Sequence, residues 1–273
     1  MLTLGLIGAT LNHSLSPQIH QLIFAELGLA GTYGLLATAP AQLGELVEQL
    51  ALDYLGVNVT IPYKRTIMPF LTSVTAEAQA IGAVNTVHFE QGAKRGYNTD
   101  YFGFGRLLAK QQVPVNGQQF TVLGTGGAAR AVLQYLLDQG AASLTIASRD
   151  PAAAAQKLSD LGGAARLQFS TYAALAGGRG GVIINCTPVG MYPQKEVSPV
   201  PPEITRCYQC AVDLIYNPRE TLFLQQARRS GAQTANGLYM LVAQAVAAEE
   251  IWLGRTLDND LISKIIQKLG DVR

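Results

Sequence analysis

Strand-like and helix-like patterns alternate along most of this chain of 273 residues. Short apolar runs bounded by glycine or polar residues are typical of buried strands, and apolar residues spaced three and four apart are typical of helices that cover a sheet. The predicted strands occupy residues 1–8, 33–37, 55–59, 83–89, 119–123, 144–147, 182–185 and 211–214. Because helical patterns lie between them, we expect an α/β fold built on parallel sheets.

The first predicted helix begins at Ser16-Pro17, with Ser16 as its N-cap and Pro17 in the first helical position. Gly28 ends this helix, whose apolar stripe consists of Ile19, Leu22, Ile23 and Leu27. A second stripe is formed by Leu43, Leu46, Val47 and Leu50. Further helices are predicted over residues 101–112 and 130–139, and the last 37 residues have a helical pattern with no obvious strand.

The turn at residues 113–117, Val-Pro-Val-Asn-Gly, indicates a crossing between two domains. The region before it reads as an α/β unit without a nucleotide-binding fingerprint, whereas the region after it contains one. The C-terminal helices could pack on either unit, and the pattern alone does not decide between them.

Composition removes several classes of protein. The chain has 20 Lys+Arg against 19 Asp+Glu, a net charge of +1, and 48% hydrophobic residues. A balanced charge gives no electrostatic case for binding nucleic acid or an anionic membrane, and so apolar a chain is not disordered. The N-terminus lacks a basic leader, and the apolar stretch at residues 238–248 is too short for a membrane helix, so we expect a cytoplasmic protein. Three cysteines provide neither a disulfide framework nor a metal site.

The turn after the fifth predicted strand carries a dinucleotide-binding pattern. Gly124, Gly126 and Ala129 match G-x-G-x-x-G/A between a strand and a helix. The first glycine permits a tight turn, the second lets the backbone approach a pyrophosphate, and the alanine allows close packing of a helix whose N-terminus faces the phosphates. We therefore predict a Rossmann-type site that includes Gly124, Gly126, Gly127 and Ala128.

The next predicted strand ends in Ser148-Arg149-Asp150, where the adenosine ribose of a dinucleotide would lie. A guanidinium at this place can pair with a 2′-phosphate, so Arg149 favours NADP. A carboxylate would instead accept a hydrogen bond from the ribose 2′-hydroxyl of NAD, so Asp150 argues against NADP. We predict NADP as the cofactor, bound in part by Ser148 and Arg149, and keep NAD as the alternative.

Four polar clusters lie in the first unit, at residues 13–17, 58–64, 82–86 and 98–100. Each lies at the end of a predicted strand or the start of a helix, where open α/β sheets place their ligands. Taken singly, a serine could be only a cap, an asparagine only a turn residue and a lysine only a surface charge. Together they suit a small polyhydroxylated carboxylate.

Lys64 and Asp100 are the candidate proton-transfer pair. A lysine ammonium can protonate a carbonyl oxygen as a hydride arrives from a nicotinamide, and a neutral amine can remove the hydroxyl proton in the reverse direction. A neighbouring carboxylate favours the charged lysine and burial opposes it.

The chain resembles the shikimate dehydrogenase family, whose members interconvert 3-dehydroshikimate and shikimate. Eight motifs in the family's order carry the resemblance: HSLSPQIH at 13–20, NVTIPYK at 58–64, GAVNT at 82–86, GYNTDYFGF at 96–104, GTGGAAR at 124–130, NCTPVGM at 185–191, DLIYNP at 213–218 and NGLYMLVAQA at 236–245.

The resemblance implies roles for the matching residues. Ser14, Ser16 and Tyr216 would hold the substrate carboxylate. The ring hydroxyls would contact Thr60, Asn85, Asp100 and Gln244. Lys64 and Asp100 would form the catalytic pair, and Gly237 and Met240 would lie near the nicotinamide.

It also implies a domain plan. Residues 1–103 would form the substrate-binding and catalytic domain, residues 104–236 the NADP-binding Rossmann domain, and residues 237–273 a group of helices that return to the substrate domain. The expected protein is a cytoplasmic oxidoreductase of aromatic amino-acid biosynthesis, in the chorismate pathway, that acts on a small molecule as a monomer or homodimer and binds neither nucleic acid, membrane nor metal.

Two departures from the family keep alternatives open. Ser148-Arg149-Asp150 stands where the family usually has Asn-Arg-Thr, and the second arginine common in the family is replaced within Ala152 to Ala155. These departures keep NAD open as the cofactor. Quinate stays open as the substrate for a different reason, because quinate-using relatives share most of these motifs. A non-catalytic sensor of nucleotide and metabolite is a further alternative, which the presence of both Lys64 and Asp100 disfavours. A related dehydrogenase for a folate or amino acid is disfavoured by Ser14, Ser16 and Asn85.

Overall fold

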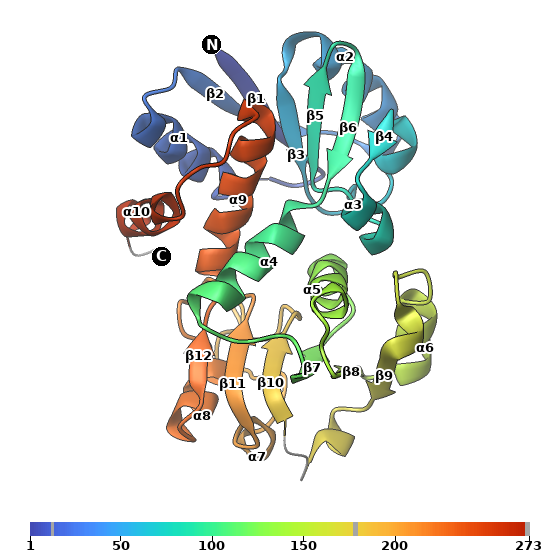
Figure 1. Cartoon of the computed structure of the whole chain (residues 1–273), viewed down its shortest axis with the longest axis vertical. Coiled ribbons are helices and arrows are strands. Elements are labelled where there is room, and N and C mark those ends of the chain that lie inside the picture. Colours follow the sequence, from blue (N-terminus) through green and yellow to red (C-terminus); the bar gives the residue numbers. More distant parts are fainter. Residues whose placement is uncertain (12–13, 177–179, 271–273) are drawn as a thin grey trace. The chain divides into compact units, whose positions relative to one another are not determined.

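A computed structural model describes residues 1–11, 14–176 and 180–270 of the chain. The described residues have an α/β architecture that divides into two compact units (Figure 1). The first unit contains Met1–Gly103 and Leu241–Gly270, and the second contains Phe104–Met240. The expected α/β fold class is confirmed.

The first unit contains a sheet in the order β2-β1-β3-β5-β6-β4. Its strands are β1 (Leu2–Gly8), β2 (Gly31–Ala37), β3 (Gly56–Val59), β4 (Ser73–Val74), β5 (Thr86–Glu90) and β6 (Ala93–Tyr97). Its helices are α1 (Ser16–Leu27), α2 (Leu43–Asp53), α3 (Ala76–Ile81) and α10 (Asp260–Leu269). Two more helices, α4 (Thr99–Lys110) and α9 (Leu238–Leu253), continue along the chain from one unit into the other.

The sheet of the first unit is mixed, so the expectation of parallel sheets is wrong there. Strands β2, β1 and β3 are parallel, but β5 runs antiparallel to β3, and β6 antiparallel to β5. Between β5 and β6 the chain reverses at Gln91-Gly92, where both residues have positive φ, +49° and +80°. Two residues of positive φ form the tight turn whose twist suits a β-hairpin.

Helix α1 begins one residue earlier than its sequence suggests. Leu15 already has helical backbone angles, and the Ser16 N–H donates to the Ser14 hydroxyl at 3.2 Å. Ser16 is therefore the first residue of the helix and not its N-cap, because the hydroxyl two residues upstream accepts the free N–H. The predicted end is confirmed, since Gly28 adopts the left-handed conformation with φ +63°.

Apolar side chains cover both faces of the first sheet. Leu43 and Val47 of α2 pack with Val57 and Val59 in one cluster. Phe24 of α1 and Trp252 of α9 pack with Leu4 and Leu6 in another cluster. Burying each large apolar side chain contributes about 1.5–3 kcal/mol, so the carboxyl ends of β1 and β3 are held firmly.

The second unit has the strand order β12-β11-β10-β7-β8-β9, and its neighbouring strands are all parallel. This is the Rossmann order 3-2-1-4-5-6. Its strands are β7 (Gln119–Leu123), β8 (Ser143–Ala147), β9 (Leu167–Ser170), β10 (Gly180–Asn185), β11 (Tyr208–Asp213) and β12 (Gln233–Ala235). The connecting helices are α5 (Gly127–Asp138), α6 (Pro151–Lys157), α7 (Pro202–Thr205) and α8 (Leu222–Arg229). Across the described residues, each helix is too short or too polar to cross a lipid bilayer.

Candidate functional site

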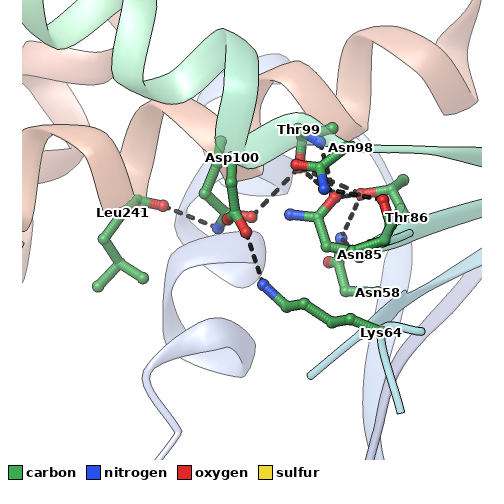
Figure 2. A network of polar contacts seen from close by, with 10 residues as sticks. Asn58, Lys64, Asn85, Thr86, Asn98, Thr99, Asp100 and Leu241 are labelled. Atoms are coloured by element: carbon green, nitrogen blue, oxygen red, sulfur yellow. Dashed lines mark hydrogen bonds and ion pairs between the residues drawn. The ribbon is translucent and has the colours of Figure 1, made fainter. Parts of the chain in front are cut away.

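The first unit brings Lys64 and Asp100 together (Figure 2). Lys64 follows β3, and its carbonyl accepts a hydrogen bond from the N–H of Val84 at 2.7 Å. Asp100 lies in the first turn of α4. The Lys64 Nζ to Asp100 Oδ2 distance is 2.6 Å, and the side chains are 20% and 13% exposed. A charge-assisted hydrogen bond thus fixes an ammonium that solvent or a ligand can still reach.

Asn85 holds the start of α4, and with it Asp100. Its Oδ1 accepts hydrogen bonds from the Thr99 N–H at 2.6 Å and from the hydroxyls of Thr99 and Thr86 at 3.1 and 3.0 Å. All three residues are buried. A helix begins with N–H groups that lack partners within the helix, and Asn85 satisfies one of them from a different segment. The three hydrogen bonds all end on Oδ1, and the Asn85 Nδ2 group takes part in none of them.

Two further asparagines support this arrangement. Asn58 Nδ2 donates to the Asn85 carbonyl at 3.3 Å and to the Thr86 hydroxyl at 3.0 Å. Asn98 Nδ2 donates to the Ala83 carbonyl at 2.9 Å. Both side chains are at most 5% exposed. Residues of three of the four polar clusters, 58–64, 82–86 and 98–100, therefore form one hydrogen-bonded layer (Figure 2).

Gln244 of α9 joins the same layer. Its Oε1 accepts a hydrogen bond from the Thr99 hydroxyl at 3.3 Å, and its Nε2 donates to the Leu241 carbonyl at 2.9 Å. Helix α9 therefore contributes to this layer a polar side chain that is 145 positions away from Thr99 in the sequence.

Ser14, Ser16 and Thr60 are partly buried near the end of β1. The Thr60 N–H donates to the Ile7 carbonyl at 2.9 Å, and a side chain placed on Gly8 would meet the Thr60 methyl group. The Ser14 hydroxyl accepts the Ser16 N–H. His13, the first residue of the HSLSPQIH motif, lies outside the described residues.

The glycine turn of the second unit fits a bound pyrophosphate. Gly124 has φ +94°, a conformation that disfavours other residues. A Cβ on Gly127 would meet no atom within 4 Å, and one on Gly126 only the Cys186 carbonyl oxygen at 4.0 Å. Ala129 is fully buried against the sheet. The N-terminus of α5 begins at this open turn without a side-chain cap among the described residues, so its N–H groups can bind a phosphate.

The end of β8 resolves part of the conflict between Arg149 and Asp150. Asp150 is the N-cap of α6, and its Oδ1 accepts the Ala153 N–H at 2.9 Å. The Ser148 hydroxyl accepts the Asp150 N–H at 3.3 Å. The Asp150 carboxylate is therefore engaged with the helix, while the exposed Arg149 remains in position to pair with an anion.

Loops after β10 and β11 are tied together by a buried carboxyl group. Asp213 accepts hydrogen bonds from Asn185 Nδ2 and the Ile215 N–H, both at 3.0 Å, and from the Thr221 hydroxyl at 2.6 Å. Asn185 Oδ1 in turn accepts the N–H and hydroxyl of Thr187 at 3.0 and 2.7 Å. Thr187 lies beside the Gly124 turn, because a Cβ on Gly124 would be 2.7 Å from its methyl group.

The other predicted cofactor and substrate residues of the second unit follow β11 and β12. Tyr216 is partly buried, which raises the pKa of its hydroxyl. The Gly237 N–H donates to the Ile215 carbonyl at 3.0 Å, and a Cβ on Gly237 would lie 2.0 Å from the Leu214 carbonyl oxygen. Met240 is 7% exposed and packs in the core of this unit. Their roles toward a ligand stay predictions.

Burial raises the pKa of Asp213 to about 6, against the opposing hydrogen bonds from Thr221, Ile215 and Asn185. An unfolded aspartate titrates near pH ~3.9, so between about pH 4 and 6 the folded chain binds the extra proton. We expect the Asp213 contribution to the free energy of unfolding to fall by about 3 kcal/mol as the pH rises through this range. Asp213→Asn should remove that slope in denaturant titrations at several pH values.

Asparagine suits the Asp213 site, because its oxygen can keep the bonds from Asn185 and Ile215 while its amide donates to Thr221. Thr221→Val is a second variant for the same test. It removes a hydrogen bond that lowers the pKa of Asp213, so the free energy of unfolding should continue to fall with pH up to a higher pH than in the wild type. An unchanged slope in Asp213→Asn would mean that this carboxyl group does not cause it.

Comparisons with known proteins agree with one another. A family model described as the shikimate dehydrogenase substrate binding domain matches residues 6–87. A shikimate dehydrogenase (NADP(+)) of Clostridium beijerinckii is 43% identical over 258 residues, which cover 94% of each chain.

Solved structures of shikimate dehydrogenases match almost the whole of this chain. A chorismate mutase/shikimate 5-dehydrogenase fusion protein of Clostridium acetobutylicum superposes with a TM-score of 0.93 at 44% identity, covering 98% of this chain and 97% of the other. A shikimate 5-dehydrogenase of Thermus thermophilus was solved in complex with NADP(H) and shikimate. It superposes with a TM-score of 0.87 at 33% identity, and the match covers 98% of this chain and 99% of the other.

Proposed function

Because the chain belongs to the shikimate dehydrogenase family, we propose that it catalyses the reversible, NADP-dependent reduction of 3-dehydroshikimate to shikimate. The observation that carries the proposal is the hydrogen bond of 2.6 Å between Lys64 Nζ and Asp100 Oδ2, at the edge of a layer of amide and hydroxyl groups. Such a layer suits a ligand that carries several hydroxyl groups.

Lys64 moves the proton in this proposal. When bound, NADP supplies the carbon that accepts a hydride from the alcohol. In shikimate oxidation, the neutral amine of Lys64 takes the proton of the reacting hydroxyl as the C–O bond becomes a carbonyl. In the reductive direction, the Lys64 ammonium gives the proton back to that oxygen. Asp100 keeps Nζ in place and accepts a hydrogen bond from a ring hydroxyl.

Substrate binding is assigned to two groups of side chains. The hydroxyls of Ser14, Ser16 and Tyr216 bind the carboxylate, since hydroxyl donors suit a carboxylate oxygen. The ring hydroxyls are bound by Thr60, Asn85, Asp100 and Gln244. Asn85 supports this role through its Nδ2 group, because its Oδ1 is occupied by Thr99 and Thr86.

The second unit binds the cofactor in this proposal. The pyrophosphate is bound by the backbone of Gly124, Gly126, Gly127 and Ala128. The 2′-phosphate is bound by Ser148 and Arg149, and the nicotinamide lies next to Gly237 and Met240. We assign residues 1–103 to substrate binding, 104–236 to NADP binding and 237–273 to helices that belong with the substrate domain. The compact units divide the described chain after Met240, and α9 begins at Leu238.

We also propose a cytoplasmic enzyme of aromatic amino-acid biosynthesis, in the chorismate pathway, that works as a monomer or homodimer on a small molecule. The net charge of +1 supports the absence of a nucleic-acid or membrane partner.

Steady-state kinetics with a two-by-two set of reagents test the proposal. NADP or NAD is combined with shikimate or quinate, and formation of reduced coenzyme is followed by its absorbance. We expect the highest kcat/KM for shikimate with NADP. No turnover with shikimate, quinate or close analogues, together with retained binding of both ligands, would replace the proposal with a non-catalytic sensor.

Replacement of Arg149 should change the coenzyme preference. Arg149→Ala removes a cation expected to make charge-assisted hydrogen bonds to the 2′-phosphate, each worth about 1.5–3 kcal/mol. We expect the KM for NADP to rise by about 10- to 100-fold while the KM for NAD changes little. Arg228→Ala, which removes an exposed arginine paired with Glu220 in the same unit, is the control. Equal effects on both coenzymes would show that Arg149 does not read the 2′-phosphate.

A further inference from the structure

A buried pair of polar side chains joins two helices of the first unit. His20 Nδ1 of α1 lies 2.6 Å from Glu249 Oε1 of α9, and both side chains are fully buried. Apolar residues of the same helices, Phe24 and Ala248, pack with Leu4 of β1 in one cluster. The pair therefore joins α1 to α9 inside the core of the unit.

The imidazole of His20 is held in one orientation by two aromatic rings. It stacks on Tyr33 of β2, with centroids 4.1 Å apart and an interplanar angle of 9°. The centroid of the Trp252 ring of α9 lies 5.7 Å away, at an angle of 44°. Trp252 Nε1 also donates to the Val87 carbonyl of β5 at 3.0 Å. This last bond fixes α9 against the sheet independently of the pair.

Stability alone does not account for this buried pair. His20 Nε2 and Glu249 Oε2 have no hydrogen-bond partner among the residues that the structure describes. Removing such polar groups from water is unfavourable, and the one hydrogen bond between them does not fully offset it. Apolar side chains of similar volume would stabilise the fold as well or better. A directional contact can instead fix which parts of two helices meet, as single polar residues do in coiled coils.

Each helix of the pair carries a residue of the predicted substrate site. Ser16, assigned to the substrate carboxylate, is four residues before His20, so the two lie one turn apart on one face of α1. Gln244, assigned to the ring hydroxyls, is five residues before Glu249 on α9. It accepts a hydrogen bond from the Thr99 hydroxyl at 3.3 Å. Because α9 is also fixed against the sheet, the element that the pair positions is α1.

We propose that the hydrogen bond between His20 and Glu249 is a positioning contact, which sets the distance between Ser16 and Gln244 and thereby the affinity for the substrate. This inference rests on the proposed function, since that function assigns both of these residues to substrate binding. His20 and Glu249 are not catalytic residues in this view, because both side chains are fully buried. They act on the substrate through the helices that carry Ser16 and Gln244.

The test is an apolar replacement of the whole pair, His20→Leu with Glu249→Met. The new side chains have similar volumes and leave no polar atom of the pair buried. We expect the free energy of unfolding in urea to equal or exceed the wild-type value. The KM for shikimate, with NADP saturating, should nevertheless rise by about tenfold, with kcat within about threefold and the KM for NADP unchanged. A pair that serves only stability would not give a stable chain with weaker substrate binding.

Three further variants accompany the apolar pair. Glu249→Gln keeps a hydrogen bond with His20 Nδ1, so its KM for shikimate should stay near the wild-type value. Glu249→Met alone should raise this KM, and it takes the place of the double variant if that chain does not fold. The matched control is Glu26→Met, which removes a carboxylate of α1 that pairs with Lys268 of α10. Its KM should be unchanged, because α10 carries no residue of the predicted site.

The outcomes separate the positioning role from the proposed function. A wild-type KM in the apolar variants, or a KM in Glu249→Gln raised as much as theirs, would overturn the positioning role. If the pair positions Ser16, Ser16→Ala should raise the KM less in the apolar background than in the wild type, and independent effects would also overturn it. Calorimetric titration with shikimate gives the same affinities without turnover. A wild-type chain that binds shikimate but does not oxidise it would overturn only the proposed function.

Discussion

Lys64→Ala is expected to lower kcat for shikimate oxidation by at least about 100-fold, while the KM for shikimate changes by less than about threefold. The amine that accepts the proton is lost, whereas the amide and hydroxyl layer that binds the ring stays in place. Initial rates over a range of shikimate concentrations, with NADP saturating, separate the two constants. Calorimetric titration with shikimate should give a dissociation constant near the wild-type value.

Lys94→Ala is the matched control for this variant. Lys94 lies in the same unit, its side chain is 16% exposed, and its Nζ pairs with Glu48 Oε1 at 2.5 Å. It therefore resembles Lys64 in burial and charge but belongs to the β6 strand away from the polar layer. If Lys64→Ala kept a normal kcat and showed only a higher KM, Lys64 would be a binding residue.

Asp100→Asn should impair both constants and lower kcat/KM by about 100-fold or more. Asparagine has nearly the same size and keeps an oxygen for Lys64 Nζ, so α4 should still begin at Thr99. The hydrogen bond from the lysine then ends on a neutral amide, which holds the ammonium less strongly, and the carboxylate that accepts from a ring hydroxyl is gone. The measurement is the same kinetic series, with circular dichroism to establish that the fold is retained.

Glu48→Gln provides the corresponding control, because it neutralises the carboxylate that pairs with Lys94. Its kcat/KM should remain near the wild-type value. An Asp100→Asn enzyme with wild-type kcat and KM would exclude the carboxylate from both substrate binding and proton transfer.

The sequence predicts the strands and helices whose apolar pattern is long enough to show a period. Strand β7 has the predicted bounds, Gln119–Leu123, and α2 begins at Leu43 as its stripe indicates. Strand β6 was not predicted, since Ala93–Tyr97 contains Lys94, Arg95 and Gly96 and pairs in a hairpin whose turn is Gln-Gly. Strands β4 and β12 have only two and three residues, which is too short for an alternation to be seen.

The sequence shows the motifs of the predicted site, but it does not show the buried side chains that hold those motifs in place. Lys64, Asn85 and Asp100 stand out because they are polar residues at the ends of apolar runs. His20 and Glu249 lie within two helices, and nothing local in the sequence shows that both side chains are fully buried and paired. This contact joins distant segments, because His20 and Glu249 are 229 positions apart in the sequence.

At the predicted cofactor site too, the sequence predicts only part of what the fold determines. The sequence places Arg149 and Asp150 side by side and leaves their opposing preferences unresolved. Folding assigns the carboxylate to the N-terminus of α6 through its bond to the Ala153 N–H, a role that any aspartate before a proline-started helix can take. A relative named shikimate dehydrogenase (NADP(+)) agrees with the predicted cofactor, and the role of Arg149 in choosing it stays a prediction.

A crystal structure of the chain with shikimate and NADP bound would test the central claim most directly, through the distance from Lys64 Nζ to the oxygen of the hydroxyl that is oxidised. We predict a hydrogen bond of about 3 Å, with the shikimate carboxylate on the hydroxyls of Ser14 and Ser16. Shikimate bound with that oxygen out of reach of Lys64, and no water between them, would contradict the account.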